Sequence, residues 1–451
     1  MNTSISLPAR VVLWLLALLF AGAAAVWALN VRDEPDINIA DAPAAANEGL
    51  VARGAYLARA GNCAACHTVR GGSPYAGGRG IDTPFGAVYS SNLTPDVKTG
   101  LGAWSSTHFW RAMHNGRSKS GRLLYPVFPY TSYTQVSRDD SDALFAFLKA
   151  LPPVTQAQPP HELRLAYRSQ AALAMWRALY FSPGVFKPDA NRSAEWNRGA
   201  YLTVGLGHCA ACHTARNALG GPSGVALAGG LIPQQNWYAP SLISPHEAGV
   251  DGKTRQDLID LLKNGVSRSA AVSGPMSEVV LGSTQYLSAG DLGAMADYLK
   301  ELPVTSALPW SSDKPDASAD SGRASRPEGE MLPAVAVPEA VAASGAKLYE
   351  QHCAQCHGDS GRGVPGAYPA LAGNRAVTMT QTSNLVQIVL NGGYAPATAG
   401  NPRPYGMPPF VLVLGDSDIA AVLTHIRTAW GNQAAVVSPL DVNRVRGHQT
   451  R

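Results

Sequence analysis

All six cysteines of this 451-residue chain occur in three copies of one short pattern, Cys-x-x-Cys-His. On a helix, the two thiols of each copy lie about one turn apart on one face, where both can bond one planar ligand. The histidine that follows can then point its imidazole at a metal held in the centre of that ligand. This pattern is the attachment signature of c-type haem. The three copies are Cys63–His67, Cys209–His213 and Cys353–His357.

The pattern therefore predicts three covalent haem c groups, with one proximal histidine for each iron. A structural zinc site or plain disulfides are the alternative interpretation. Zinc would need two Cys-x-x-Cys units converging on one ion, whereas these units lie about 145 residues apart and each has its own histidine. The predicted cofactor-binding thiols are Cys63, Cys66, Cys209, Cys212, Cys353 and Cys356, and the predicted proximal metal ligands are His67, His213 and His357.

Length and composition agree with three haem-binding domains. At about 100–150 residues per domain, the chain corresponds to roughly three domains. The formal net charge of +4 and the 15% share of charged residues imply no charge-driven partner such as nucleic acid. No Gly-x-Gly-x-x-Gly follows a strand, and no cysteine is left to hold an iron–sulfur cluster. We therefore expect no catalytic residue here.

Repeated phrases mark the beginning and the end of each haem unit. The opening phrase Arg53–Leu57 returns as Arg198–Leu202, and Ser344–Tyr349 is a looser third version. The closing segments have apolar residues at intervals of three and four, which is typical of an amphipathic helix. We expect the first and last helices of each unit to cross and pack, with the haem beneath them. The closing segments are Asp142–Leu148, Leu292–Leu299 and Ile419–Ile426.

These repeats give the domain map of a mainly α protein. A proline pair and a helical stretch at Gln170–Phe181 predict a packed bridge that joins the first two units into one body. The Pro-, Ser- and Asp-rich stretch after Pro303 predicts an extended linker. The segments are 1–30 (membrane anchor or signal segment), 49–155 (first haem domain), 156–197 (helical connector), 198–303 (second haem domain), 304–341 (flexible linker), 342–430 (third haem domain) and 431–451 (polar tail).

The N-terminus predicts export from the cytoplasm. The run Val11–Leu29 contains no charged residue, and Arg10 before it with acidic residues after it places the bulk of the chain outside. Its nineteen residues, with Trp14 and Trp27 suited to the membrane–water boundary, favour a retained anchor. A cleaved signal peptide is the alternative, since Ala23-x-Ala25 is an acceptable cleavage pattern. We expect the retained anchor, with the protein on the periplasmic side of the inner membrane.

Several longer phrases carry a family resemblance that runs from about Gly49 to Arg427. The chain resembles the three-haem cytochrome c subunits of membrane-associated bacterial dehydrogenases. The resemblance implies three tandem class I cytochrome c domains after an N-terminal membrane segment. The phrases that carry it are Gly54–Cys63, Thr83–Gly86, Ser91–Asp96 and Thr99–Ser105.

In that family, the cytochrome takes electrons from a catalytic dehydrogenase subunit and delivers them to ubiquinone or to a terminal oxidase. The resemblance therefore implies an electron-transfer protein whose catalytic partner is of the molybdopterin, quinoprotein or flavin type. Two other classes stay open from the sequence. One is a multihaem peroxidase, and the other is the cytochrome subunit of a terminal oxidase.

Methionine loops supply candidate sixth ligands for the second and third haems. A thioether in that position gives six-coordinate iron with a raised potential, which suits electron transfer. Met276 follows Gly274-Pro275, and Met407 stands in Tyr405-Gly406-Met407-Pro408, each ahead of a closing helix. A buried methionine can instead be core filler, but such proline-flanked loops are not typical of a core. We predict Met276 and Met407 as ligands.

The first haem unit departs from the family pattern. Where the family reads Tyr-Pro-x-Met-Pro-Tyr, this chain has Phe128, and phenylalanine cannot bind iron. Met113 is the predicted substitute because it shares the apolar face of its helix with Phe109 and Trp110, and His114 is the second choice. A five-coordinate haem, with both residues structural, is the remaining alternative. The phenylalanine variant resembles cytochromes that accompany molybdopterin aldehyde and N-heterocycle dehydrogenases.

Overall fold

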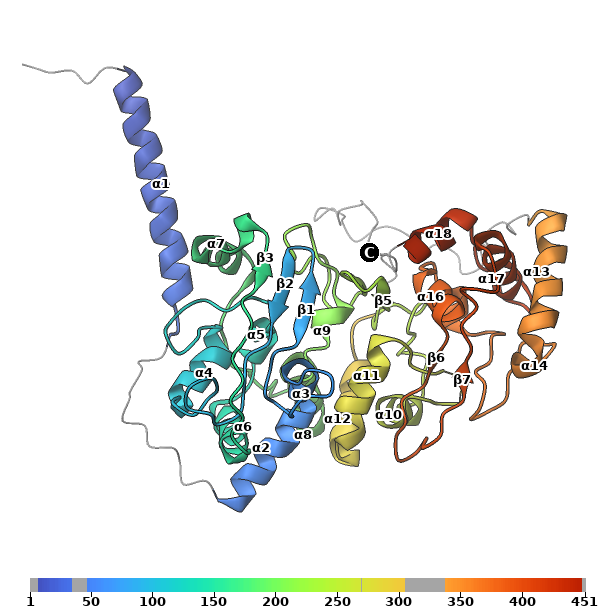
Figure 1. Ribbon diagram of the computed structural model, residues 1–451, viewed down its shortest axis with the longest axis horizontal. Helices are drawn as coiled ribbons and strands as arrows, with labels where there is room; N and C mark the ends of the chain where they lie inside the picture. Colours follow the sequence, from blue (N-terminus) through green and yellow to red (C-terminus); the bar gives the residue numbers. More distant parts are fainter. Residues whose placement is uncertain (1–6, 35–46, 269, 305–336, 448–451) are drawn as a thin grey trace, which may run out of the picture. The chain divides into compact units, whose positions relative to one another are not determined.

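The computed structural model describes residues 7–34, 47–268, 270–304 and 337–447, which form two compact units (Figure 1). Unit 1 comprises the described residues up to Pro188, with Val204–His208 and Ala218–Gly221. Unit 2 comprises Asp189–Thr203, Cys209–Asn217 and the described residues from Pro222 onward. The second and third Cys-x-x-Cys-His copies therefore share one unit. This grouping differs from our expectation that the first two copies form one body.

Unit 1 is a helical domain with a small antiparallel sheet of order β1-β2-β3. The expected helix at 170–181 is present as α7, but the segment before it contributes the third strand, in which Leu163 is buried and Glu162 exposed. The elements are α1 (Leu7–Val31), α2 (Glu48–Ala60), α3 (Cys63–His67), β1 (Gly80–Thr83), β2 (Gly86–Tyr89), α4 (Ser106–Asn115), α5 (Tyr130–Tyr133), α6 (Arg138–Ala150), β3 (Glu162–Leu163), the 3-10 helix η1 (Leu165–Tyr167) and α7 (Gln170–Tyr180).

Unit 2 contains two further helical regions, each with a short hairpin. The elements from α8 to α12 are α8 (Ala194–Val204), α9 (Ala210–His213), β4 (Gly230–Ile232), β5 (Trp237–Ala239), α10 (Arg255–Asn264), α11 (Pro275–Gly282), the 3-10 helix η2 (Thr284–Tyr286) and α12 (Ala289–Lys300). The later elements are α13 (Glu339–His352), α14 (Ala354–His357), α15 (Arg375–Thr378), α16 (Ser383–Asn391), β6 (Gly393–Tyr394), β7 (Gly406–Met407), α17 (Asp416–Thr428) and α18 (Pro439–Gly447).

Side-chain amides join these two regions of unit 2. The Asn384 amide on α16 accepts a 2.7 Å hydrogen bond from the Tyr238 backbone amide and donates one of 2.7 Å to the Tyr238 carbonyl. This pairing uses both groups of an edge-strand residue on β5. Single asparagines of this kind carry no periodicity, so no sequence pattern indicates that the second and third haem units pack together.

The opening and closing helices around each Cys-x-x-Cys-His copy cross at a glycine. Gly54, Gly199 and Gly345 lie so close to the partner helix that a Cβ atom would overlap the backbone carbonyl of Ala143, Ala294 or Ala421 respectively. In the first two units, the arginine before the glycine pairs with an aspartate in the first turn of the closing helix. Those ion pairs are Arg53–Asp140 at 2.6 Å and Arg198–Asp291 at 2.8 Å. The repeated Arg-Gly-Ala-Tyr-Leu phrase is thus a helix-crossing motif.

The C-terminal segment differs from the expected polar tail at 431–451. Its helix α18 packs on α16 and α17, with Val442 and Val445 buried. Ser438 caps the helix by accepting a 3.2 Å bond from the Asp441 backbone amide. Two valines three residues apart form an apolar stripe too short to stand out in a polar stretch. Most of the expected linker at 304–341 lies outside the described residues.

One described helix, over Arg10–Val31, is long and apolar enough to cross a membrane. A helix of this length and composition is typical both of a membrane anchor and of a signal sequence.

We expect Gly54→Ala to lower the free energy of unfolding of unit 1 by about 1–3 kcal/mol, because the added methyl forces α2 and α6 apart. Gly49→Ala is the matched control on α2, since its Cβ would meet only the Asn47 side chain at 3.5 Å. This control should unfold at the same temperature as the parent or slightly higher. Far-UV circular dichroism during heating measures both, and equal midpoints for the two variants would contradict the crossing as described.

Candidate functional site

Each Cys-x-x-Cys-His copy forms a short helical turn directly after the opening helix of its unit. We refer to Cys63–His67 as site 1, Cys209–His213 as site 2 and Cys353–His357 as site 3. In the described part of the chain, the six cysteines form no disulfide, and no group of three or more Cys, His, Asp or Glu residues gathers as a metal cluster would require. Burial raises the pKa of Cys63 and of Cys209 to about 12, and that of Cys353 to about 11.

The three motif histidines share one hydrogen-bond arrangement. Nδ1 of His67 lies 2.7 Å from the Ser91 carbonyl oxygen, Nδ1 of His213 lies 2.7 Å from that of Pro240, and Nδ1 of His357 lies 2.9 Å from that of Pro369. A carbonyl oxygen can only accept, so Nδ1 must donate and carry the proton. Burial also lowers the pKa of all three imidazoles, which favours the neutral ring.

A neutral imidazole with its proton on Nδ1 has its lone pair on Nε2. That is the state a metal-binding histidine needs, and a carbonyl on the opposite nitrogen is the usual way to fix it. The same arrangement occurs three times, although the acceptor residue and its distance along the chain differ each time. The residues at all three sites thus fit an iron porphyrin.

Three glycines hold the motif histidines from the backbone side. The carbonyl oxygens of His67, His213 and His357 each accept a 2.8 Å hydrogen bond from a glycine amide. These glycines are Gly77, Gly229 and Gly363, all with positive φ, a conformation that other residues adopt rarely. Sequence reasoning missed them because they stand 10, 16 and 6 residues after the histidine (77 − 67, 229 − 213 and 363 − 357), which is no fixed spacing.

The first cysteine of each pair faces apolar or aromatic neighbours, as attachment to an apolar ring requires. Cys209 packs against the cluster of Leu227, Ala228 and Ile243, and Cys353 packs against the main core of its unit. At site 1, the neighbours are Tyr75 and Tyr133, and the pKa of each phenol is raised by burial and by the nearby Cys63. The three thiol pairs therefore lie at the edge of a core.

The structure places Met407 near site 3. Met407 packs against the same core cluster as Cys353. Its loop is also tied to the loop that holds His357, because the rings of Tyr405 and Tyr368 lie 5.1 Å apart and Tyr368 directly precedes Pro369. Met407 itself is half-buried on β7, which pairs with β6.

Met276 lies in the first turn of α11 and is half-buried. The glycine before that turn, Gly274, packs against the indole of Trp237 so closely that a Cβ would overlap it. Trp237 begins β5, which leads into Pro240, the hydrogen-bond acceptor of His213. The methionine turn and the histidine of site 2 are therefore positioned by the same strand.

Site 1 has Phe128 where the other two loops have methionine. The Phe128 ring lies 5.3 Å from the ring of Tyr133, whose hydroxyl donates to the Gly61 carbonyl at 3.2 Å, so this loop lies over the site. Met113 is 5% exposed on α4. It lies one turn after Phe109, which packs on Phe145 of α6. This face of α4 points into the core of unit 1.

His114 has a different set of contacts. Its ring stacks on Trp110 at 4.6 Å, and its Nδ1 lies 3.0 Å from the Thr134 carbonyl oxygen. Burial lowers the pKa of His114, and the nearby Asp33 opposes that effect. Asp33 follows α1, so His114 is directed toward the end of that helix.

The two histidines that precede a motif cysteine also contact aromatic rings. His208 lies 5.7 Å from Tyr133 in unit 1, and His352 lies 5.9 Å from Phe410 in unit 2. Both therefore have partners of their own beside a predicted site.

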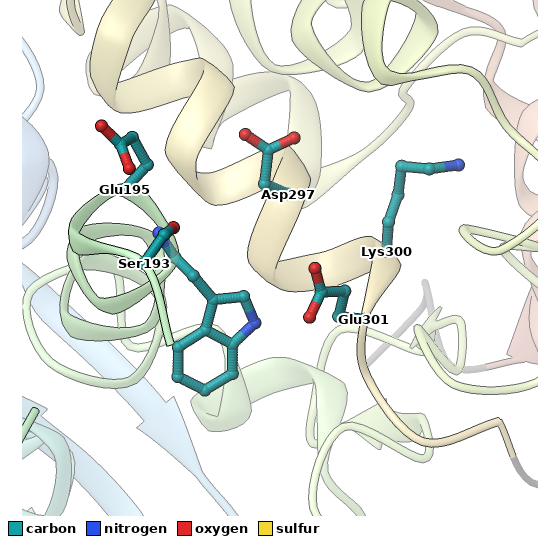
Figure 2. A pocket seen from close by; sticks show the side chains of 6 residues that line it. Ser193, Glu195, Asp297, Lys300 and Glu301 are labelled. Carbon is teal, nitrogen blue, oxygen red and sulfur yellow. The ribbon is translucent and has the colours of Figure 1, made fainter. Parts of the chain in front are cut away.

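A separate pocket of about 460 Å³ lies where α8 and α12 cross (Figure 2). Its lining mixes acidic and basic groups, and Lys300 points away from the carboxylates in Figure 2. None of its lining residues is a cysteine, histidine or methionine, so this pocket is distinct from the three sites. The lining residues are Ser193, Glu195, Trp196, Asp297, Lys300 and Glu301.

Site 2 contains a buried carboxylate that sequence reasoning missed. Glu247 is 5% exposed and accepts hydrogen bonds from the Ser241 backbone amide at 2.6 Å and from the Tyr238 hydroxyl at 3.2 Å. It thereby fixes the loop on either side of Pro240. Burial raises the pKa of Glu247 above its ordinary value of 4.5, and the two hydrogen bonds oppose the rise. Within the described residues, no salt bridge to Glu247 is formed.

The chain is similar to known cytochromes c. The family model described as cytochrome c matches residues 51–152 and 342–430. The cytochrome c subunit of a quinone-linked alcohol dehydrogenase from Gluconacetobacter polyoxogenes is 37% identical, with 89% of this chain and 85% of that protein covered. The gluconate 2-dehydrogenase cytochrome c subunit of Pantoea cypripedii is 36% identical over 90% of this chain and 91% of its own.

A third relative is much longer than this chain. A nicotinate dehydrogenase subunit from Pseudomonas putida is 37% identical over 87% of this chain but only 32% of its own length. The chain thus corresponds to about one third of that protein.

We expect replacement of Glu247 by glutamine to flatten the pH dependence of stability. A carboxyl whose pKa is raised in the folded state binds its proton more tightly there than in the unfolded chain. Its contribution to stability is therefore complete below pH 4.5 and is lost as the pH rises through the folded pKa. Between about pH 5 and 8, the melting temperature of the parent should fall on the order of 2–4 °C further than that of Glu247→Gln.

Glu278→Gln, at an exposed glutamate of the same unit, is the matched control and should follow the parent. Parallel curves of melting temperature against pH for the parent and Glu247→Gln would show that this carboxyl is not strained by its burial.

Proposed function

The chain belongs to the family of dehydrogenase cytochrome c subunits, and from this premise we propose that it relays electrons from a periplasmic dehydrogenase subunit to ubiquinone or a terminal oxidase. It is an electron-transfer subunit and not the polypeptide that oxidises the substrate. The observation that carries the proposal is the threefold arrangement of half-buried, Nδ1-protonated histidines, each beside a thiol pair. That repetition supports three covalent haem c groups.

The residues of this chain would hold each group in a defined state. The thiols Cys63, Cys66, Cys209, Cys212, Cys353 and Cys356 would bond the porphyrin, and His67, His213 and His357 would bind iron through Nε2. Bound haem supplies a one-electron couple, Fe(III)/Fe(II). The chain fixes the ring orientation of each histidine through a backbone carbonyl and keeps the site dry, so that little reorganisation accompanies a change of charge.

We propose Met276 and Met407 as the sixth ligands at sites 2 and 3. The supporting observations are the strand that joins Met276 to the His213 loop and the tyrosine pair that joins Met407 to the His357 loop. At site 1 we propose Met113. The His114 ring stacks on Trp110 and lies near Asp33 at the end of α1, whereas Met113 lies on the face of α4 that points into the core.

We propose that α1 is a retained anchor and that both units lie on the periplasmic side of the inner membrane. The support lies in the polar residues that follow the apolar run. Asn30 is 7% exposed and Glu34 forms ion pairs with Arg111 and Arg117, so the end of α1 is built into unit 1. A sequence that served only for export would gain nothing from these contacts.

We propose a molybdopterin dehydrogenase for aldehydes or N-heterocycles as the catalytic partner, with quinoprotein or flavin enzymes as the other types. The support is Phe128, together with the similarity to the nicotinate dehydrogenase subunit. The identity to the alcohol and gluconate dehydrogenase subunits is nearly equal, so the phenylalanine decides the preference.

Purification of the full chain from membranes in mild detergent tests the electron-transfer function. We expect a dehydrogenase subunit to co-purify and its substrate to reduce the haem absorbance without any added mediator. Pyridine haemochrome analysis should give three haems per chain, and two in a variant with Cys353→Ala and Cys356→Ala. Turnover of hydrogen peroxide by the chain alone, or association with an oxidase and no dehydrogenase, would overturn the proposal.

Met113→Leu tests the sixth ligand at site 1. We expect the iron at site 1 to lose its thioether ligand. One haem in three should then give a high-spin ferric signal and have a lower potential. Met175→Leu is the control, because Met175 is 60% exposed. An unchanged spectrum and potential in Met113→Leu would assign the role to another residue, and His114→Leu should then produce the same change.

A further inference from the structure

Unit 1 exposes an apolar surface on α7 and on η1, the short helix that precedes it. Leu165 is 84% exposed, Met175 60% and Leu179 62%. Single exposed apolar residues are ordinary, but these three lie on two elements that contact each other. We call Leu165, Met175 and Leu179 the interfacial residues.

Hydrogen bonds hold α7 against the last turn of α1 (Figure 1). The Asn30 side-chain amide donates to the Ala174 carbonyl at 2.9 Å, and the Arg177 Nε donates to the Asn30 side-chain oxygen at 2.9 Å. Asn30 and Arg177 are 7% and 3% exposed. Because Met175 directly follows Ala174, it lies at the level where the apolar run of α1 ends.

Further polar contacts fix the direction in which α1 leaves unit 1. Glu34 pairs with Arg117 at 3.2 Å and with Arg111 at 3.5 Å. Arg117 also donates to the Asn30 carbonyl at 2.9 Å, and the Asn115 amide donates to the Asp33 carbonyl at 3.1 Å. If α1 spans a bilayer, these contacts place α7 at the bilayer surface.

Arginines accompany the interfacial residues. Arg164 and Arg168 are exposed on either side of η1, and the exposed Arg122 shares the surroundings of Tyr125 with Arg168. Trp27 on α1 is 68% exposed. Apolar side chains bordered by arginine and tryptophan are typical of segments that lie in the boundary between headgroups and acyl chains.

We propose that η1 and α7 form a second membrane contact, which lies in the surface of a bilayer that contains anionic phospholipid. The interfacial residues enter the acyl boundary, and Arg164 and Arg168 bind lipid phosphates. The proposal rests on the retained anchor proposed above, and it adds a surface that holds unit 1 at a fixed orientation on the membrane.

This contact has a consequence for site 1. The buried side of α7 carries Arg177, whose guanidinium lies 5.1 Å from the ring centre of Tyr130 and 4.6 Å from that of Phe181. Tyr130 is fully buried and ends the loop that carries Phe128. Helix α7 thus packs against the loop over site 1 through Arg177 and Tyr130, and this contact links the loop to the bilayer surface.

Photo-cross-linking of the full chain in lipid nanodiscs tests the second membrane contact. Benzoylphenylalanine would replace Met175, with Phe20 on α1 as the positive control and the exposed Val225 of unit 2 as the negative control. In discs of phosphatidylcholine with phosphatidylglycerol, we expect lipid adducts at positions 175 and 20 and none at 225. Arg164→Gln with Arg168→Gln should lower the yield at 175 several-fold, whereas Arg70→Gln should leave it unchanged.

The controls separate this proposal from the proposed anchor. Lipid adducts at 20 without any at 175 would overturn the second contact and leave the anchor intact. Adducts between 175 and another polypeptide would likewise overturn it, since α7 would then face a protein. A mature chain that lacks α1 by mass would overturn the anchor, and adducts at 175 in that chain would still support the contact of α7 with lipid.

Discussion

The close approach of two helix backbones at a glycine is the constraint on which each haem unit depends. Where Gly54, Gly199 or Gly345 meets the carbonyl of the closing helix, no side chain can intervene. The crossing point therefore fixes the end of the opening helix, and the Cys-x-x-Cys-His turn begins within a few residues of it. A loop from the rest of the unit then needs only one carbonyl in the right place to orient the histidine. This arrangement tolerates loops of very different length, as the three acceptors Ser91, Pro240 and Pro369 show.

Much of this organisation could be predicted from the sequence because it is local. The cysteine spacing, the opening phrase and the closing helices are each a short, continuous stretch of sequence. Such stretches can be recognised from residue spacing alone. What could not be predicted depends on contacts between distant residues. Asn384 joins β5 to α16 by two hydrogen bonds, and Leu163 adds a strand to the sheet of unit 1, but neither residue leaves a periodic trace. The hydrogen-bond acceptors of the three histidines could not be predicted either, because every residue has a backbone carbonyl.

Site 1 differs from the other two sites in its distal loop and in its connection to the N-terminal helix, and the two differences are in contact. Its loop has phenylalanine in place of methionine, and that loop ends at Tyr130, which stacks with an arginine from α7. The helix before it carries Met113 on one face, while the adjacent His114 is directed toward the end of α1. A change in the distal loop and a connection to the N-terminal helix thus occur in the same unit. Tyr130, Arg177 and Asn30 form a continuous buried chain of contacts, which links the distal loop to the end of α1.

Charge at site 2 is arranged differently from charge at site 1. Around the end of α1, Glu34 lies between two arginines, so the attraction between opposite charges offsets part of the cost of removing them from water. Among the described residues, the hydrogen-bond partners of Glu247 are a backbone amide and a phenol, which are weaker partners for a buried carboxylate than an arginine. If His213 holds a haem iron, oxidation of that iron would add a positive charge on the side of the loop that Glu247 fixes and would favour the ionised carboxylate. By linkage, ionisation of Glu247 would stabilise the oxidised state by the same amount, so a haem at site 2 should have a potential that falls as the pH rises through the pKa of this group. The loop of site 1 carries Asp96 instead, and hydrogen bonds from Thr99 and Thr155 lower the pKa of this carboxyl, so site 1 should lack this coupling near neutral pH.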